Sequence, residues 1–128
     1  MHEIQVRVRY ADTDQMGLVH HARYFEWFEM GRTELMRALG LSYKAFEQAG
    51  YRLPVAEASA AYLRPAFYDD LLTVRTTLAE RPRPKLRLDY EVLRDGQLLA
   101  TGYTTHVFVN LNGRPVKPPR LFLDLLGQ

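Results

Sequence analysis

The sequence contains no cysteine, so disulfide bonds, thiolate nucleophiles and cysteine-ligated metal sites are all excluded. It also lacks a long hydrophobic run: no window approaches the ~20 apolar residues of a membrane span, and residues 1–7 contain no apolar signal region. A strong charge imbalance is absent too, because 17 basic residues stand against 15 acidic ones for a net charge of +2. These absences predict a cytoplasmic protein whose partner is neither a nucleic acid nor a membrane.

The composition is that of an ordinary globular protein, with 47% hydrophobic and 25% charged residues. A chain of 128 residues is long enough for one hydrophobic core, which predicts a single domain over residues 1–128. Most of the basic residues, 14 of 17, are arginine. Arginine suits the planar recognition of phosphate or carboxylate groups, so an anionic ligand fits this composition.

The spacing of apolar residues predicts one long helix, two short helices and five strands. Gly31 lies inside the long helix, where a glycine is explained by the close approach of a sheet. The Asp95-Gly96 pair predicts a tight hairpin, and Gly102 a bend in the last strand. The helices are expected at residues 21–39, 42–48 and 121–126, and the strands at residues 4–10, 54–64, 72–78, 86–92 and 98–111.

This order of elements predicts an α+β fold, in which a curved five-stranded antiparallel sheet wraps around one long central helix. The aromatic residues Tyr24, Phe25, Trp27 and Phe28 of that helix are expected in the core. Five strands leave exposed edges and do not enclose a long helix completely. Edge-to-edge association into a homodimer is therefore expected.

One polar loop, residues 10–17, lies between the first strand and the long helix and carries Asp12, Asp14 and Gly17. Unpaired N–H groups and a partial positive charge at a helix start can polarise a carbonyl group. A carboxylate beside such a site is the minimum equipment for hydrolysing an ester or a thioester. Asp14 alone is also compatible with helix capping or turn formation, and Asp12 is assigned a structural role.

A metal site is not predicted. Asp12, Asp14 and Gly17 imitate the start of a calcium-binding EF-hand loop, but Met16 and Arg23 occupy positions that require oxygen ligands. The adjacent His20 and His21 point about 100° apart on a helix and rarely share one ion.

Residues 9–24, Arg-Tyr-Ala-Asp-Thr-Asp-Gln-Met-Gly-Leu-Val-His-His-Ala-Arg-Tyr, resemble the signature of the hotdog-fold acyl-CoA thioesterases. The groups that they resemble are the 4-hydroxybenzoyl-CoA thioesterases and their Tol-Pal-associated relatives. The resemblance continues through residues 32–34, 62–66, 69–70 and 102, so it spans most of the chain. It implies an acyl-CoA hydrolase without a cofactor, coenzyme A being part of the substrate. It also implies dimers, often paired into homotetramers, with active sites at the dimer interface.

The same resemblance assigns roles to individual residues. Asp14 matches the catalytic carboxylate, which acts as nucleophile or general base, and the sequence leaves these two roles open. His21 matches the residue whose backbone N–H faces the thioester carbonyl, and Gly17 matches the glycine that lets the loop approach the acyl group. His20 departs from the pattern, since relatives usually carry a bulky aromatic residue there. The alanine-rich strand at residues 54–64 is a second departure, which could widen the acyl site.

Basic residues around position 83 form a proline-rich turn, and related proteins bind the coenzyme A nucleotide with basic residues in this region. Arg83 and Lys85 are therefore candidate phosphate contacts, with Arg64 as a further candidate. A solvated basic turn explains the cluster equally well.

Two other functions are the alternatives to a thioesterase. A non-catalytic acyl-CoA or pantetheine-binding module would bind coenzyme A without releasing a thiol. A hotdog dehydratase uses a histidine and an acid from separate segments, an arrangement that Asp14 in this loop fits poorly.

Overall fold

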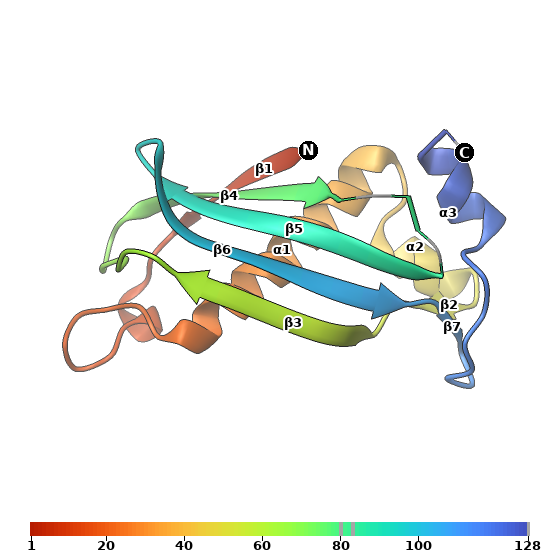
Figure 1. Ribbon diagram of the computed structural model, residues 1–128, viewed down its shortest axis with the longest axis horizontal. Coiled ribbons are helices and arrows are strands. Elements are labelled where there is room, and N and C mark those ends of the chain that lie inside the picture. The colour runs from red at the N-terminus through yellow and green to blue at the C-terminus, as the bar shows by residue number, and fades with distance from the viewer. Residues whose placement is uncertain (80, 83, 128) are drawn as a thin grey trace.

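A five-stranded antiparallel sheet curves around one long helix in the computed structural model, which describes residues 1–79, 81–82 and 84–127 (Figure 1). The helices are α1 (His21–Leu39), α2 (Tyr43–Gln48) and α3 (Arg120–Leu125), with a 3-10 turn at Tyr10–Asp12. The strands are β1 (His2–Arg7), β2 (Tyr51–Arg52), β3 (Val55–Tyr62), β4 (Leu71–Leu78), β5 (Lys85–Arg94), β6 (Gln97–Val107) and β7 (Val109–Asn110). The expected α+β fold with its five-stranded antiparallel sheet is confirmed.

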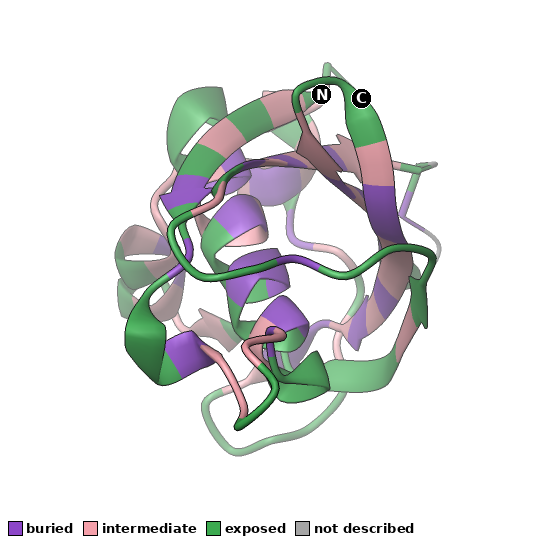
Figure 2. Ribbon diagram, turned by 90° about the vertical axis from the view of Figure 1, so that its left-hand side faces the viewer, coloured by how far each residue is buried: buried purple, intermediate pink, exposed green. Residues whose placement is uncertain are grey.

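The large sheet has the strand order β1-β4-β5-β6-β3, so β1 and β3 are its edges. Buried residues gather on the turns of α1 and on the strands that curve around it (Figure 2). The buried residues of α1 are Tyr24, Trp27, Phe28, Gly31, Leu35 and Met36. Phe25 was expected in the core with its aromatic neighbours, but it is 37% exposed. That expectation is wrong because Phe25 lies on the side of the helix that this sheet leaves uncovered.

Two glycines allow the helix and the sheet to approach closely, as the sequence predicted for Gly31. A Cβ atom on Gly31 would collide with the Thr76 hydroxyl oxygen of β4. A Cβ atom on Gly102 would lie 2.5 Å from the Phe28 ring. Pairing continues through Gly102, which is opposite Tyr90 on one side and Ala60 on the other. Gly102 therefore makes room for an aromatic ring of α1.

The ends of the predicted helices and the hairpin follow from local chemistry. The expected bounds of α1 are confirmed, and Gly40 ends it with a positive φ of 102°. The Ser42 hydroxyl accepts from the Ala45 N–H at 3.1 Å and caps α2. Asp95 and Gly96 both have positive φ, which suits the tight turn between β5 and β6.

The first strand is shorter than the alternation of residues 4–10 predicted. β1 ends at Arg7, and residues 10–12 form a 3-10 turn instead. The reason is the Asp12 carboxylate, which accepts from the Arg9 backbone N–H at 2.8 Å and turns the chain back.

The last predicted strand, residues 98–111, is two strands in the structure. β6 ends at Val107, and β7 leaves the large sheet to pair with β2. Phe108, at the break, is 1% exposed and packs against Phe46 of α2 and Phe122 of α3. This aromatic cluster redirects the chain, and a period-two pattern does not reveal it.

Candidate active site

The loop at residues 13–19 is held by its own backbone. Thr13 and Val19 form a bridge across its base, and Asp14 N–H donates to the Leu18 carbonyl at 2.8 Å. Gly17 has a φ of +80°, and nothing lies within 4 Å of where its Cβ would be. Gly17 is therefore required for the backbone conformation of the loop.

Asp14 is half-buried and uses one carboxylate oxygen to shape the loop. Its Oδ1 accepts from the Met16 N–H at 2.8 Å and from the Leu18 N–H at 3.1 Å. Among the residues that the structure describes, none donates a hydrogen bond to Asp14 Oδ2. The turn-forming role and a chemical role are therefore compatible, because each can use a different oxygen.

Asp14 lines a pocket of about 420 Å³ between the start of α1 and the end of β3. The pocket brings Asp14 together with His21 and Arg64, three of the residues predicted from the sequence. Gly17 does not line it. The remaining lining residues are Leu18, Val19, His20, Ala22, Tyr24, Tyr62, Leu63 and Pro65.

The start of α1 lies at the wall of this pocket, and its first backbone N–H groups have no partner within the helix. His20 is the N-cap residue, and its side chain makes no capping hydrogen bond. The N–H groups of His21 and Ala22 have no carbonyl one turn earlier in the helix to bind, and both residues line the pocket. These donors, together with the helix dipole, create a positive potential that suits a carbonyl oxygen or an anion.

The His21 side chain packs against Tyr62 at the end of β3. Its ring stacks on the ring of Tyr62 with centroids 4.1 Å apart, and the Tyr62 hydroxyl donates to the His21 carbonyl at 3.1 Å. Tyr24 meets Tyr62 edge-on at 5.1 Å. Burial raises the pKa of both tyrosines, so both stay protonated near neutral pH. Sequence reasoning did not assign these tyrosines to the site, although Tyr62 opens a stretch that carried the family resemblance.

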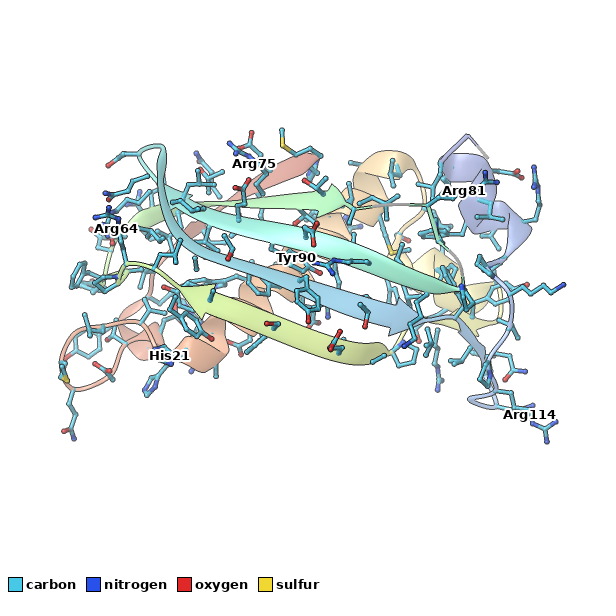
Figure 3. The ribbon with its side chains drawn as sticks, in the orientation of Figure 1. His21, Arg64, Arg75, Arg81, Tyr90 and Arg114 are labelled. Atoms are coloured by element: carbon cyan, nitrogen blue, oxygen red, sulfur yellow. The ribbon has the colours of Figure 1, made fainter. Side chains whose placement is uncertain are left out.

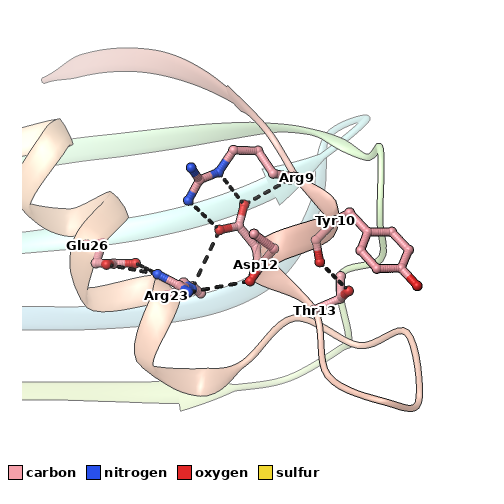
Figure 4. A network of polar contacts seen from close by, with 7 residues as sticks. Arg9, Tyr10, Asp12, Thr13, Arg23 and Glu26 are labelled. Atoms are coloured by element: carbon pink, nitrogen blue, oxygen red, sulfur yellow. Dashed lines mark hydrogen bonds and ion pairs between the residues drawn. The ribbon is translucent and has the colours of Figure 1, made fainter.

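Asp12 holds the loop onto the helix, as its predicted structural role requires (Figure 4). It is 1% exposed, and its carboxylate pairs with Arg9 at 2.9 Å and with Arg23 at 3.6 Å. Burial disfavours the charged carboxylate, but the hydrogen bonds from Arg9 and the charges of Arg9 and Arg23 outweigh it and lower its pKa. The Asp12 carbonyl accepts from the His20 N–H at 2.9 Å. This network therefore sets where α1 begins.

Two of the three candidate phosphate contacts, Arg64 and Lys85, lie at opposite ends of the sheet within one chain. Arg64 lies beside His21 at one end of the sheet, whereas Arg81, from the turn before β5, lies at the other end (Figure 3). Lys85, the first residue of β5, is opposite Val107, whereas Tyr62 is opposite Ala100 on the same strand β6. Seven residues of extended chain span roughly 23 Å. Arg83 lies outside the described residues.

Among the described residues, no three histidine, aspartate or glutamate side chains are grouped so that they could hold a metal ion. In the same part of the chain, no helix is long and apolar enough to cross a membrane.

Comparisons with known proteins bear on the family and the fold of this chain. Residues 8–126 match the sequence profile of the thioesterase-like superfamily. The acyl-CoA thioesterase YbgC of Haemophilus influenzae is 32% identical over 117 residues, covering 90% of this chain and 86% of that protein.

Solved structures are similar over nearly the whole chain. The hypothetical protein TT1821 of Thermus thermophilus has a TM-score of 0.92 and 36% identity, covering 98% of this chain and 96% of its own. The DHNA-CoA thioesterase of Staphylococcus aureus has a TM-score of 0.90 and 30% identity, covering 98% of this chain and 85% of its own. The hotdog fold expected from the sequence is confirmed by these neighbours.

Proposed function

Because the chain belongs to the thioesterase-like superfamily and is a thioester hydrolase, we propose that it hydrolyses an acyl-CoA to a free carboxylic acid and coenzyme A. One observation carries the assignment of the site. The Asp14 oxygen without a hydrogen bond and the uncapped start of α1 line the same pocket. A nucleophile or base and an electrophile-binding group are the two parts that thioester hydrolysis requires.

The N–H groups of His21 and Ala22 take the thioester carbonyl oxygen. Negative charge develops on this oxygen when the carbonyl carbon is attacked, and donors already aimed at it stabilise that charge without reorganising. Removing one such donor raises a barrier by about 3 kcal/mol in well-studied hydrolases. The His21 ring supports the first turn through its contact with Tyr62.

Asp14 Oδ2 acts either as the nucleophile or as the general base. As a nucleophile it bonds to the carbonyl carbon, the C–S bond breaks, coenzyme A leaves, and water hydrolyses the resulting anhydride. As a general base it takes a proton from a water molecule, whose oxygen attacks the carbonyl carbon directly. Either route gives one carboxylic acid and one thiol for each water consumed.

Arg64 is the candidate for holding a phosphate of coenzyme A, because it lies on the wall of the pocket and is exposed. Lys85 is too far from the Asp14 pocket of its own chain. It would reach an Asp14 pocket only in an assembly, where it would approach the pocket of a second copy. Among the described residues, no strand pairs with the outer side of edge strand β3. Antiparallel pairing of two β3 strands would place Val55 of one copy near Tyr62 of the other. A homodimer of this form, with or without further pairing into tetramers, would bring the Lys85 end of one copy to the Asp14 pocket of its partner.

The decisive experiment is thiol release from a panel of aromatic and aliphatic acyl-CoAs, with wild type and Asp14→Asn side by side. Asparagine keeps Oδ1 as an acceptor for the Met16 and Leu18 N–H groups, so the loop is preserved while the attacking oxygen is lost. We expect turnover to fall by at least about 10³-fold, with coenzyme A binding nearly unchanged. Near-normal turnover in folded Asp14→Asn would refute the assignment of Asp14.

A wild-type protein that binds coenzyme A but releases no thiol from any member of the panel would instead be the non-catalytic binding module. Formation of an enoyl product from a hydroxyacyl-CoA would identify a dehydratase. A cytoplasmic location stays a prediction.

A further inference from the structure

A second cavity, of about 300 Å³, lies against the other half of α1. No residue lines both this cavity and the Asp14 pocket. Its walls are mostly apolar and include Leu35, Leu39, Leu86, Leu88 and Phe122. An engineered cavity of ~150 Å³ holds benzene, so this one has room for a larger apolar group.

His106 lines the cavity and belongs to a chain of buried hydrogen bonds behind its wall. The Tyr90 hydroxyl lies 2.6 Å from the Thr104 hydroxyl, which lies 2.8 Å from Nε2 of His106. His106 Nδ1 lies 3.0 Å from the carbonyl oxygen of Leu53. A carbonyl oxygen only accepts, so Nδ1 donates to it, Nε2 of the neutral ring accepts from Thr104, and Thr104 accepts from Tyr90. Both nitrogens of His106 are therefore engaged, and its ring is not the group that binds a ligand.

Arg32 supplies the charge in this cavity. It is half-buried and lines the cavity, and its charge opposes the rise in the pKa of Tyr90 that burial causes. Across residues 1–79, 81–82 and 84–127, Arg32 forms no ion pair. One turn later on the same helix, Arg37 pairs with Glu34 at 3.2 Å. Arg32 thus lines a mostly apolar cavity, and no carboxylate of the described residues compensates its charge.

Glu29 also lines the cavity, three residues before Arg32. Glu29 is exposed and does not form an ion pair with Arg32, so its carboxylate remains in solvent at the rim. A ligand carboxylate that reached Arg32 would be repelled by Glu29 and attracted by the guanidinium at closer range.

We propose that this cavity binds a small organic carboxylate with an apolar body, whose carboxylate pairs with Arg32. The apolar walls disfavour a bare inorganic anion, and the uncompensated guanidinium disfavours a neutral ligand. Charge-assisted hydrogen bonds from the planar guanidinium give the carboxylate a defined orientation. Within one chain the cavity shares no lining residue with the Asp14 pocket, and the proposal does not depend on thioesterase activity.

The methionines provide a spectroscopic test of the site. The chain has 4 methionines, of which Met36 lines this cavity and Met16 lies in the Asp14 loop. With the methionine methyl groups labelled with ¹³C, titration with hexanoate should shift the Met36 signal saturably and leave that of Met16 in place. A response of Met16 without Met36 would overturn the proposal, because hexanoate would then occupy the Asp14 pocket.

A neutral ligand analogue and protein variants test whether binding depends on the positive charge of Arg32. Hexanamide, which has nearly the same shape without the charge, should bind wild type about tenfold or more weakly than hexanoate does. Arg32→Met should weaken hexanoate binding by a similar factor, whereas the control Arg37→Met on the same helix should not change it. Glu29→Gln should strengthen binding by removing the repelling charge. Equal affinity of wild type for hexanoate and hexanamide, or unchanged hexanoate binding by Arg32→Met, would refute the role of Arg32.

Discussion

The ring of His21 stacks on the ring of Tyr62 with the two planes 12° from parallel, so the first residue of α1 rests on the last residue of β3. The hydroxyl of Tyr62 adds a hydrogen bond to the His21 carbonyl. Helix start and strand end both line the Asp14 pocket. This contact between two residues 41 positions apart therefore fixes one dimension of the pocket.

Substitution of Tyr62 should separate the contribution of its ring from that of its hydroxyl. Tyr62→Phe keeps the stack and loses one hydrogen bond, worth about 0.5–1.5 kcal/mol, so turnover should stay within a few-fold of wild type. Tyr62→Ala removes the stack and loosens the helix start, and kcat should fall by about tenfold or more. Steady-state thiol release measures both. Full activity of Tyr62→Ala would show that the stack does not position the donors.

Asp12→Asn should destabilise the protein rather than remove the reacting group. The variant loses the charge that holds Arg9 and Arg23, and the free energy of unfolding should fall by about 1–3 kcal/mol. The matched control is Glu26→Gln, which breaks the more exposed Arg23–Glu26 pair and should change stability by less than about 1 kcal/mol. Urea unfolding at pH 7 measures both, and equal losses would contradict the structural role of Asp12.

The stability difference between wild type and Asp12→Asn should also depend on pH in a defined direction. The pKa of Asp12 is lowered in the folded protein, so its stabilising contribution is present above the unfolded value of ~3.9 and is lost as pH falls through the folded value. The difference should therefore stay constant from pH 7 to about 5 and shrink below it. A difference that grows on acidification would contradict this sign.

Gly31→Ala should destabilise the protein in a way that depends on Thr76. The new methyl group meets the Thr76 hydroxyl, and overpacking of this kind typically costs about 1–3 kcal/mol. In a Thr76→Ala background the obstacle is gone, and alanine should be neutral or stabilising because it favours helix by about 1 kcal/mol over glycine. A double-mutant cycle of unfolding free energies measures the coupling. Equal losses in both backgrounds would show that Thr76 is not what Gly31 accommodates.

Sequence patterns predicted the parts of this fold that depend on neighbours along the chain. The bounds of α1 follow from helical spacing and from Gly40, and the β5–β6 hairpin follows from Asp95-Gly96. The break at Phe108 did not follow, because the rings that redirect it, Phe46 and Phe122, belong to helices distant in sequence.

In the candidate site too, sequence patterns predicted what depends on neighbours along the chain and missed what depends on the tertiary fold. The placement of Asp14 beside the helix start could be predicted because the two are adjacent in sequence, and both line one pocket. Its catalytic role stays a prediction. The distance of Lys85 from that pocket could not be found, because it depends on which end of β5 faces the loop. The uncompensated charge of Arg32 also escaped sequence reasoning, since an arginine on a helix ordinarily pairs in solvent, as Arg37 does.

Removal of divalent metal ions should leave turnover unchanged. The proposed reaction uses a carboxylate, backbone N–H groups and water, none of which needs a Lewis acid. Thiol release should be the same before and after dialysis against EDTA, with readdition of Mg²⁺ or Zn²⁺ as the control. Loss of activity that a metal restores would contradict the proposed mechanism.

Ala58→Lys should separate the copies of the proposed homodimer. Ala58 is exposed near the middle of edge strand β3, where antiparallel pairing of two copies would bring the two new lysines close together. The mass measured by light scattering should fall from two chains to one, and turnover should fall with it if the partner completes the pocket. Gln97→Lys, at the exposed start of β6 in the hairpin, is the matched control and should stay dimeric. If Ala58→Lys keeps the wild-type mass and activity, β3 is not the edge through which the copies associate, and Lys85 has no route to the Asp14 pocket by this pairing.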